Sequence, residues 1–362
     1  MSRLGLLARR AARSRLLGLL TQPYSPSRWT ELVNPLWSEE DRAKVLDVRH
    51  ETDDVLTITL QPAPGWPGHR AGQHTVLRAD VDGVRYSRAF TLASSAHRTG
   101  TVELTCKAYP DAVVVPWLRD TAEAGTVVGL DLPTGDVVLP EPRPEHLVCV
   151  VGGSGITPAM AMLRTLRDER HTGRISFVQF ARTADDVLFA DELDELMGVL
   201  PGLRTTTIVT RDTAGPHAGR RLDKALLDEL APGWQDATSL VCGPVPMLEA
   251  AEEIWTGDLA DRLLVERFRP KPLVIPDDVS GTVKFSKSQV TTDNDGRTLL
   301  EQAEDAGLTP EFGCRMGICH TCDVPKLQGI TRDVRNDEVD AGERDRIQPC
   351  VSVALGDVDL HL

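Results

Sequence analysis

Three cysteines lie within nine residues of this chain, and they constrain its fold more than any other stretch of the sequence. Cys314, Cys319 and Cys322 have the spacing C-x4-C-x2-C, and Cys350 follows after a further 27 residues. Cysteines grouped in this way form disulfides, bind structural zinc, act as a redox dithiol or hold an iron–sulfur cluster. Each alternative makes a different demand on the rest of the sequence.

The disulfide, zinc and dithiol alternatives each meet an objection. The chain has seven cysteines, an odd number, and Leu16–Leu20 is too short for the apolar core of a secretory signal, so we expect a cytoplasmic protein with reduced thiols. Structural zinc sites more often offer two C-x2-C pairs or histidines, and we expect His320 to be a solvated loop residue. A dithiol would use Cys319 and Cys322 and would leave Cys314 without a role.

The remaining alternative is an iron–sulfur cluster, because the spacing matches plant-type [2Fe–2S] ferredoxins. Residues 280–362 resemble such a ferredoxin domain, which implies a β-grasp-like α+β fold. The segment TVKFSKSQVTTDNDG suits a β-hairpin, and Thr298 and Glu301 have the spacing of a helix capping box. The resemblance implies four cluster ligands: Cys314, Cys319, Cys322 and Cys350. Cys106 and Cys149 lie on predicted strands and are expected to be core residues.

The rest of the chain predicts further domains, since 362 residues exceed what one core usually supports. Residues 41–142 read as short alternating strands, with a hairpin signal at Asp82-Gly83, and predict an antiparallel β-barrel. Residues 143–268 alternate apolar strands with helices and predict an α/β domain with a parallel sheet. Residues 269–279 contain three prolines and predict a linker. Residues 1–40 predict a basic N-terminal arm.

Two motifs in the first two domains point to nucleotide chemistry. VVGGSGITP (150–158) follows an apolar strand and opens a helix, where free amides favour a pyrophosphate. There we expect Thr157 to cap the helix and Pro158 to lie in its first turn. RAFTLASS (88–95) resembles the R-x-Y-[ST]-x-x-S segment of the ferredoxin–NADP reductase family. CGPVPM (242–247) and ERF (266–268) resemble two later motifs of that family, in the same order.

The family resemblance implies a role for each matching residue. Catalytic roles fall on Thr91, Cys242 and Glu266, which would order the flavin and the nicotinamide for hydride transfer. Arg88 would pair with flavin phosphate, Phe90 would stack on the flavin ring in place of the usual tyrosine, and Phe268 would cover its other face. The nicotinamide loop and its neighbour would be formed by Gly152, Gly153, Gly155, Thr157, Pro158, Gly243 and Pro244.

The identity of the flavin and of the nucleotide is less constrained. AVVV (112–115) lacks the glycine and serine of the family's pyrophosphate turn, so FMN stays open beside the expected FAD. Arg182 follows the second strand of the α/β domain, where a cation could meet a 2′-phosphate, and Arg211 is a second candidate. NADPH is therefore expected as the electron donor, with NADH as the alternative.

The order flavin, nicotinamide, [2Fe–2S] implies an oxidoreductase that passes electrons from NADPH to a one-electron metalloenzyme. PLW (35–37), CRMGICHTC (314–322) and CVSVALGDVDL (350–360) most resemble actinobacterial reductases that feed a membrane-bound stearoyl-CoA Δ9-desaturase. The alternatives are a reductase for a ring-hydroxylating dioxygenase or a cytochrome P450, and a non-catalytic redox-sensing electron-transfer subunit. The acceptor is expected to dock at the rim formed by Arg315, Met316 and His320.

Charge adds expectations about partners and location. The net charge of −14 argues against nucleic acid. Residues 1–30 carry six arginines and no acid, whereas residues 276–362 carry 17 acids and nine bases. A basic amphipathic arm suits peripheral contact with the inner face of the cell membrane. No stretch of the sequence approaches the roughly 20 apolar residues of a membrane span.

Overall fold

The computed structural model describes residues 41–109, 112–211, 214–215, 217–268, 279–318, 320–342 and 346–362. The predicted arm at 1–40, almost all of the predicted linker and Cys319 lie outside these residues. The chain divides into two compact units, of which the first contains two sheets and the second contains a third. The predicted multidomain fold class is confirmed: an antiparallel barrel, a parallel α/β sheet and an α+β ferredoxin-type domain.

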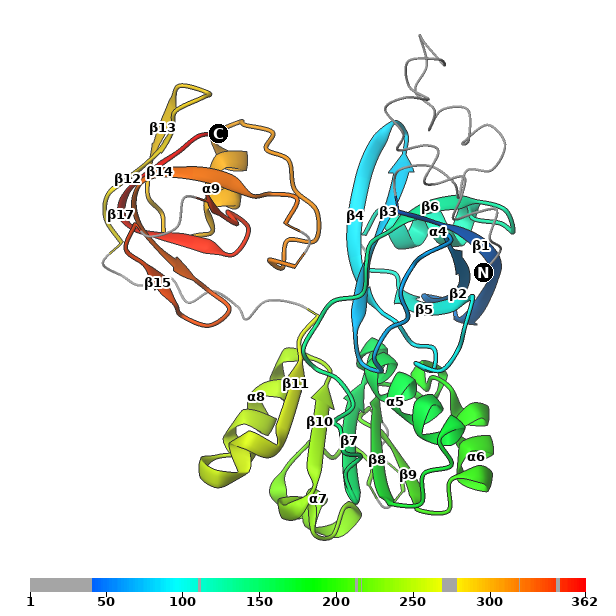
Figure 1. The fold of residues 1–362 in the computed structure, drawn as a ribbon. Coiled ribbons are helices and arrows are strands. Elements are labelled where there is room, and N and C mark those ends of the chain that lie inside the picture. The colour runs from blue at the N-terminus through cyan, green and yellow to red at the C-terminus, as the bar shows by residue number, and fades with distance from the viewer. Residues whose placement is uncertain are drawn as a thin grey trace. The chain divides into compact units, whose positions relative to one another are not determined.

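The first sheet has six strands in the order β4-β3-β6-β1-β2-β5 (Figure 1). The strands are β1 Arg42–Thr52, β2 Val55–Pro62, β3 His74–Val81, β4 Val84–Thr91, β5 Val102–Lys107 and β6 Val127–Leu130. Asp82 and Gly83 join β3 to β4 with φ of 51° and 82°, the two positive values that a tight hairpin turn needs. An isolated bridge between Leu92 and Leu104 joins the chain after β4 to β5 and closes the barrel.

One helix interrupts the region that the sequence predicts as all β. Helix α4, Val114–Thr121, buries Val114, Val115 and Leu118 against the barrel core. The prediction of strands alone was wrong here. The β-branched valines favour strands locally, but burial of three apolar side chains outweighs that preference.

The second sheet has five parallel strands in the order β11-β10-β7-β8-β9. The strands are β7 His146–Gly152, β8 Arg174–Ala181, β9 Leu203–Val209, β10 Thr238–Cys242 and β11 Leu263–Glu266. The helices are α5 Ile156–Asp168, α6 Ala190–Val199, α7 Lys224–Leu230 and α8 Val245–Ile254. Short 3-10 helices are η2 Gly153–Gly155, η3 Ala184–Asp186, η4 Trp234–Asp236 and η5 Gly257–Arg262. Strand β7 is the central strand in this order, and the glycine-rich loop follows its carboxyl end.

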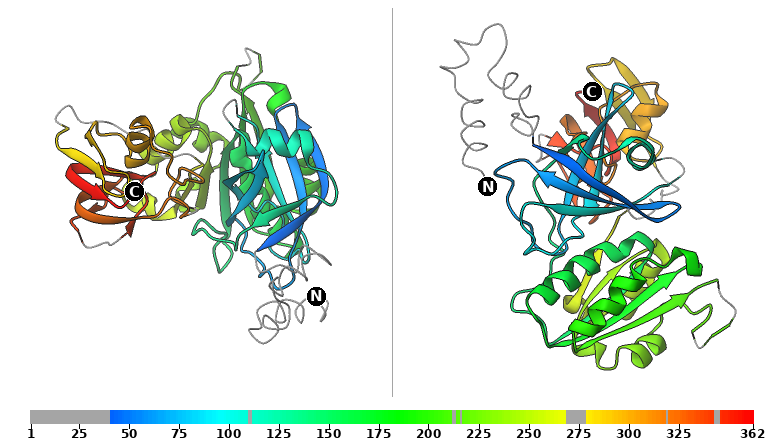
Figure 2. Two further views of the ribbon diagram at one scale, coloured as in Figure 1. Left: turned by 90° about the horizontal axis from the view of Figure 1, so that it is seen from above. Right: turned by 90° about the vertical axis from the view of Figure 1, so that its right-hand side faces the viewer.

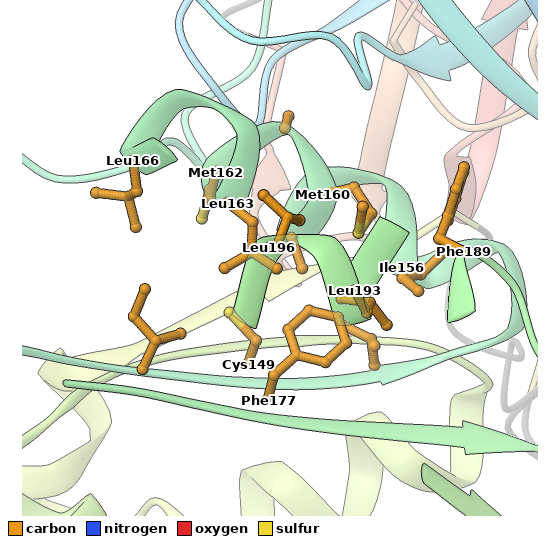
Figure 3. Packing of buried hydrophobic residues seen from close by; sticks show 14 of the residues in the cluster. Cys149, Ile156, Met160, Met162, Leu163, Leu166, Phe177, Phe189, Leu193 and Leu196 are labelled. Carbon is orange, nitrogen blue, oxygen red and sulfur yellow. The ribbon is translucent and has the colours of Figure 1, made fainter. Parts of the chain in front are cut away.

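Helices cover both faces of this parallel sheet (Figures 1 and 2). One apolar cluster contains residues of α5 and α6, and a separate cluster contains residues of α7 and α8. In the first cluster, Met160 and Leu163 of α5 lie above Cys149 of β7 and Phe177 of β8 (Figure 3). Cys149 is 0% exposed and Cys106 is 1% exposed, so both are core residues, as predicted.

The third sheet has the order β13-β12-β17-β14-β15, with β16 paired to β14. The elements are β12 Thr282–Phe285, β13 Val290–Asp293, α9 Leu299–Asp305, β14 Val324–Asp333, β15 Val339–Asp340, β16 Arg346–Ile347 and β17 Ser352–Leu360. The predicted hairpin is β12–β13, and the predicted capping box between Thr298 and Glu301 is present at the start of α9. None of the helices in the described part of the chain is long and apolar enough to span a bilayer.

Candidate functional site

The predicted flavin segment lies at the end of β4 and in the turn that follows. Phe90 is half-buried and packs on the barrel core, and the Arg88 guanidinium donates to the carbonyl of Ser87 at 2.8 Å. Thr91 is 3% exposed, and its hydroxyl has no hydrogen-bond partner among the described residues. Because a buried hydroxyl is costly without a partner, Thr91 fits a ligand such as flavin that completes its hydrogen bonding.

The glycine-rich loop after β7 packs against the loop after β10. Gly153 has a φ of +55°, which favours glycine. A Cβ added to Gly155 would lie 2.3 Å from the Cys242 carbonyl oxygen, and one added to Gly152 would lie 2.9 Å from Cδ of Pro244. A Cβ added to Gly243 would lie 2.7 Å from the sulfur of Met247. These contacts keep side chains out of a backbone cradle that fits a dinucleotide.

The start of α5 differs from the sequence prediction in one respect. Gly155 is the N-cap residue, with no side-chain cap, and Thr157 lies inside the first turn, where its hydroxyl donates to the Ser154 carbonyl at 3.0 Å. The prediction that Thr157 caps the helix was therefore wrong, since a cap must accept from a helix amide. Pro158 lies in the first turn, as predicted. The absence of a side-chain cap fits a site where a bound anion meets these amides.

Gly155→Ala should disrupt the nucleotide loop without affecting the flavin barrel. Gly155 has a φ of −64°, which alanine tolerates, so the cost comes from the 2.3 Å contact with the Cys242 carbonyl. We expect NADPH binding to weaken by roughly tenfold or more, because the β7 and β10 loops must separate. Gly198→Ala on α6 is the control, since a Cβ there meets no atom within 4 Å. Titration of the bound flavin spectrum with NADP⁺ would measure both, and unchanged binding in G155A would contradict the prediction.

Cys242 and Glu266 end neighbouring parallel strands and are register partners. Cys242 is 1% exposed, and burial, together with the Glu266 charge, raises the pKa of its thiol. Burial also raises the pKa of Glu266 to about 7. The structure therefore brings two of the three predicted catalytic residues together. Phe268 lies two residues beyond Glu266, at the end of the described segment.

The two candidate nucleotide-phosphate arginines are neighbours at the ends of β8 and β9. The Arg211 amide donates to the Arg182 carbonyl at 3.0 Å, so the segments that follow the two strands lie side by side there. The Arg182 side chain is 55% exposed and pairs with Asp186 at 3.0 Å. Asp186 also accepts from Thr183 in a capping box of η3, which anchors the carboxylate. A 2′-phosphate could thus meet two cations on one exposed edge of the sheet.

Three of the four predicted cluster ligands are described, and all three are buried. Cys322 and Cys350 bring their sulfur atoms to 3.3 Å, and the amides of Met316 and Ile318 donate to the Cys314 sulfur at 3.3 and 3.4 Å. Amide donors aimed at a sulfur suit a thiolate ligand. No group of three or more metal-ligating residues forms within the described ranges, which omit Cys319. The donor set of the loop fits a [2Fe–2S] cluster.

Charged side chains hold the cluster loop in its bent path. Gly317 has a φ of +70°, and a Cβ there would lie 2.6 Å from the Arg335 guanidinium, which donates to the Gly317 carbonyl. Asp333 pairs with Arg335 at 2.6 Å. Arg315 pairs with Glu304 and lies over the Phe312 ring. His320 is solvent-exposed, as predicted, and contacts Asp323 at 3.2 Å.

Sequence reasoning missed Arg335 as a support of the cluster loop and Arg164 as a support of the flavin segment. Neither residue belongs to a local motif, and the carbonyl that each one supports lies far away along the chain. Arg335 reaches back 18 residues to Gly317, and Arg164 reaches back 71 residues to Ala93. In the sequence, neither Arg335 nor Arg164 can be distinguished from an ordinary solvated surface arginine.

The barrel, the nucleotide cradle and the cysteine loop together define a flavin- and [2Fe–2S]-dependent oxidoreductase of the ferredoxin reductase type. Comparison with protein families agrees. Residues 47–138 match an oxidoreductase FAD-binding domain, residues 149–253 an oxidoreductase NAD-binding domain, and residues 283–355 a 2Fe-2S iron-sulfur cluster binding domain. The predicted cofactors FAD, [2Fe–2S] and NAD(P)H are confirmed at this level.

Known proteins are similar to this chain over most of its length. An NADPH oxidoreductase of Mycobacterium tuberculosis is 36% identical over 354 residues, which is 95% of this chain and 90% of the relative. The ferredoxin reductase component of a 3-ketosteroid-9-alpha-monooxygenase from Mycolicibacterium smegmatis is 28% identical, covering 85% of this chain and 92% of its own length. The chain belongs to the family of NAD(P)H-dependent electron-transfer reductases with FAD-binding, NAD-binding and [2Fe–2S] domains.

A solved structure shows the same fold over nearly the full length. Phthalate dioxygenase reductase, described as a modular structure for electron transfer from pyridine nucleotides to [2Fe–2S], has a TM-score of 0.59 and 21% identity. The match covers 89% of this chain and 97% of that one. The similarity extends through all three domains.

Proposed function

We propose that this reductase passes electrons from NADPH through FAD and [2Fe–2S] to a membrane-bound fatty acyl-CoA desaturase. The observation that carries the proposal is that one chain contains both a nucleotide cradle and a loop of buried cysteines. FAD supplies the chemistry that links a two-electron donor to single-electron steps. Such a chain therefore serves a metalloenzyme that accepts electrons singly.

The residues of the flavin segment would hold the cofactor in a fixed orientation. Arg88 would pair with its phosphate through the planar guanidinium, and Phe90 would stack on its ring. Thr91 would donate its buried hydroxyl near the ring nitrogen that receives hydride. The cost of the unpartnered Thr91 hydroxyl supports this role, because a ligand atom there would remove the cost.

The nucleotide side of the site would position the reduced nicotinamide. Gly152, Gly153 and Gly155 would admit the pyrophosphate to the helix amides, with Gly243 and Pro244 forming the neighbouring loop. Cys242 and Glu266 would lie beside the nicotinamide, and Phe268 would cover the flavin face until the nicotinamide enters. Close, ordered contact of this kind supplies much of the rate in hydride transfer.

Arg182 and Arg211 would select NADPH through its 2′-phosphate. We expect the Arg182→Ala, Arg211→Ala double variant to raise the KM for NADPH by roughly 100-fold or more, because two charge-assisted hydrogen bonds are lost and each is worth about 1.5–3 kcal/mol. The KM for NADH should stay within about twofold of wild type, since NADH lacks that phosphate. Steady-state ferricyanide reduction with both nucleotides measures the ratio, and equal effects on both KM values would count against this role.

The desaturase assignment rests on sequence resemblance and on charge. PLW (35–37) and the two cysteine segments resemble the desaturase reductases, and residues 276–362 carry a net excess of acids. The acidic domain would dock the acceptor at the rim formed by Arg315, Met316 and His320. The six arginines of residues 1–30, which lie outside the described residues, would contact the inner face of the membrane.

The decisive experiment compares acceptors. Purified holoprotein and NADPH are combined with desaturase-containing membranes, and conversion of stearoyl-CoA to its unsaturated product is measured. We expect product only with NADPH, reductase and desaturase together, and weaker turnover after removal of residues 1–25. Absence of product with active desaturase would refute the acceptor while leaving the reductase itself intact.

A second candidate is an oxygenase reductase. Several relatives carry such names, including a glycine betaine monooxygenase reductase subunit of Chromohalobacter salexigens that is 27% identical over 85% of this chain. The same holoprotein, offered a ring-hydroxylating oxygenase or a cytochrome P450 in place of the desaturase, distinguishes the two candidates by product formation. A redox-sensing subunit would instead show little NADPH oxidation with ferricyanide or cytochrome c.

A further inference from the structure

A buried arginine of α5 joins the α/β domain to the flavin barrel. Arg164 is 6% exposed. Its guanidinium makes a bidentate pair with Glu192 of α6, with both distances 2.6 Å, and donates to the Ala93 carbonyl at 2.7 Å. It also reaches Glu103 of β5 at 3.3 Å and lies 5.3 Å from the centre of the Phe189 ring. One side chain therefore links α5, α6 and two segments of the barrel.

Neighbouring residues of α5 and its C-terminal end extend this contact along the segment 93–97. The Ala96 amide donates to the Thr165 hydroxyl at 3.0 Å, and Ser95 hydrogen-bonds Asp168. His97 contacts Glu169 at 2.7 Å. We call these contacts, together with Arg164–Ala93, the α5 seam. Of the residues from Ala93 to His97, all except Ser94 thus have a partner in α5 or directly after it.

Arg164 and Glu169 stay charged across the physiological pH range. Hydrogen bonding to Arg143, with His97 contributing, lowers the pKa of Glu169 to about 2. Arg164 is an arginine in a bidentate pair and so remains a cation. The contact between Arg164 and the Ala93 carbonyl is therefore a fixed mechanical link rather than a switch.

The two ends of the seam lead directly to the two halves of the proposed hydride-transfer site. Helix α5 begins at Ile156, directly after its N-cap Gly155 in the nicotinamide loop, and ends at Asp168. Ala93 lies two residues after Thr91, and its backbone is held on both sides, since its amide donates to the Glu103 carbonyl at 2.8 Å while its carbonyl accepts from Arg164. A helix is stiff over 13 residues, so a shift at Ala93 would displace Thr91 relative to the nicotinamide loop.

We propose that Arg164 is a positioning residue for hydride transfer, which holds the flavin segment in register with the nicotinamide loop at the start of its own helix. This proposal rests on the proposed roles of Thr91 and of the glycine loop. A buried ion pair is weak support for stability by itself, because desolvation offsets the attraction. A planar, multidentate guanidinium does fix geometry, and hydride transfer depends steeply on geometry.

The test compares Arg164→Lys and Arg164→Met with wild type in stopped-flow flavin reduction. At saturating NADPH, with rates expressed per bound flavin, we expect reduction to slow by roughly 10- to 100-fold, since a displacement of about 1 Å can cost that much. The Kd for NADP⁺ should stay within about twofold. Electron passage from chemically reduced enzyme to ferricyanide should be unchanged, because that half-reaction does not use the nicotinamide.

Arg204→Met is the matched control. Its guanidinium donates to the carbonyls of Pro201 and Leu203, at the amino end of β9, away from the carboxyl ends that form the site. It should reduce its flavin at the wild-type rate. A purely structural role for Arg164 would lower holoprotein yield and melting temperature but leave the rate per flavin within twofold of wild type, and that result would overturn the proposal.

Thr165→Val keeps the proposal testable if the Arg164 variants do not fold. It removes the acceptor for the Ala96 amide without leaving a buried charge, and we expect a three- to tenfold slower flavin reduction. A wild-type rate in T165V would overturn the proposal in that case. Thr91→Ala, measured in parallel, distinguishes failure of the proposed hydride-transfer site from failure of the positioning role. If T91A reduces its flavin at the wild-type rate, the proposed site is wrong. If T91A reduces its flavin slowly while the Arg164 variants react at the wild-type rate, only the positioning role of Arg164 is refuted.

Discussion

Cys350→Ser is expected to abolish electron transfer to protein acceptors while leaving flavin reduction intact. The Cys350 sulfur lies 3.3 Å from that of Cys322, and serine replaces a thiolate ligand with a poor one. NADPH-dependent cytochrome c reduction should fall by about 100-fold or more, because even partners outside the ligand shell are worth about 10–100-fold. Ferricyanide reduction, which can draw on flavin directly, should stay within about twofold.

Cys149→Ala provides the control for this variant. Cys149 is equally buried but lies in the core of the parallel sheet, so its loss should leave the visible absorbance of the cluster unchanged. Cys319→Ser should behave like C350S if Cys319 is the fourth ligand. A C350S protein that kept both the cluster absorbance and cytochrome c reduction would show that Cys350 is not a ligand.

Features that depend on neighbours in the sequence could be predicted. The Asp82-Gly83 turn, the capping box at Thr298 and Glu301, and the buried strand beneath the glycine loop each follow from local geometry. The cysteine spacing and the flavin motif predicted the [2Fe–2S] and FAD-binding domains in the same way, because a short segment must present its side chains at fixed offsets. The order of the motifs then gave the order of the domains.

Features that depend on distant contacts could not be predicted. Helix α4 forms because the barrel offers Val114, Val115 and Leu118 an apolar surface, which no local preference reveals. Thr157 looks like a cap in the sequence, but the helix follows directly on the 3-10 turn Gly153–Gly155, so Gly155 takes the N-cap position. Arg164 and Arg335 acquire their roles from partners that only the fold brings near.

Glu266 should make hydride transfer from NADPH depend on pH. Burial raises the pKa of its carboxyl to about 7, so it is mostly neutral below that pH and charged above it. A carboxylate beside the nicotinamide would stabilise the positive charge that develops there as hydride leaves. Two unit charges about 4 Å apart interact by roughly 4 kcal/mol at an effective dielectric constant of about 20, and part of that reaches the transition state. We therefore expect kcat/KM for NADPH to rise by about 10- to 100-fold through pH 7.

Glu266→Gln should remove this rise and hold the rate near its low-pH value, whereas Glu253→Gln, on the exposed face of α8, should retain it.

The raised pKa of Glu266 also makes the stability of the fold depend on pH, with a definite sign. Between about pH 4.5 and pH 7 the folded chain keeps a proton that the unfolded chain has lost, so the stability contributed by this group falls as pH rises. The full effect is at most about 3–4 kcal/mol. E266Q should accordingly melt at a higher temperature than wild type at pH 8, with the difference shrinking towards pH 5. A parallel loss of stability in both proteins over this range, with kcat/KM for NADPH flat in wild type, would exclude a charge at Glu266 from the reaction.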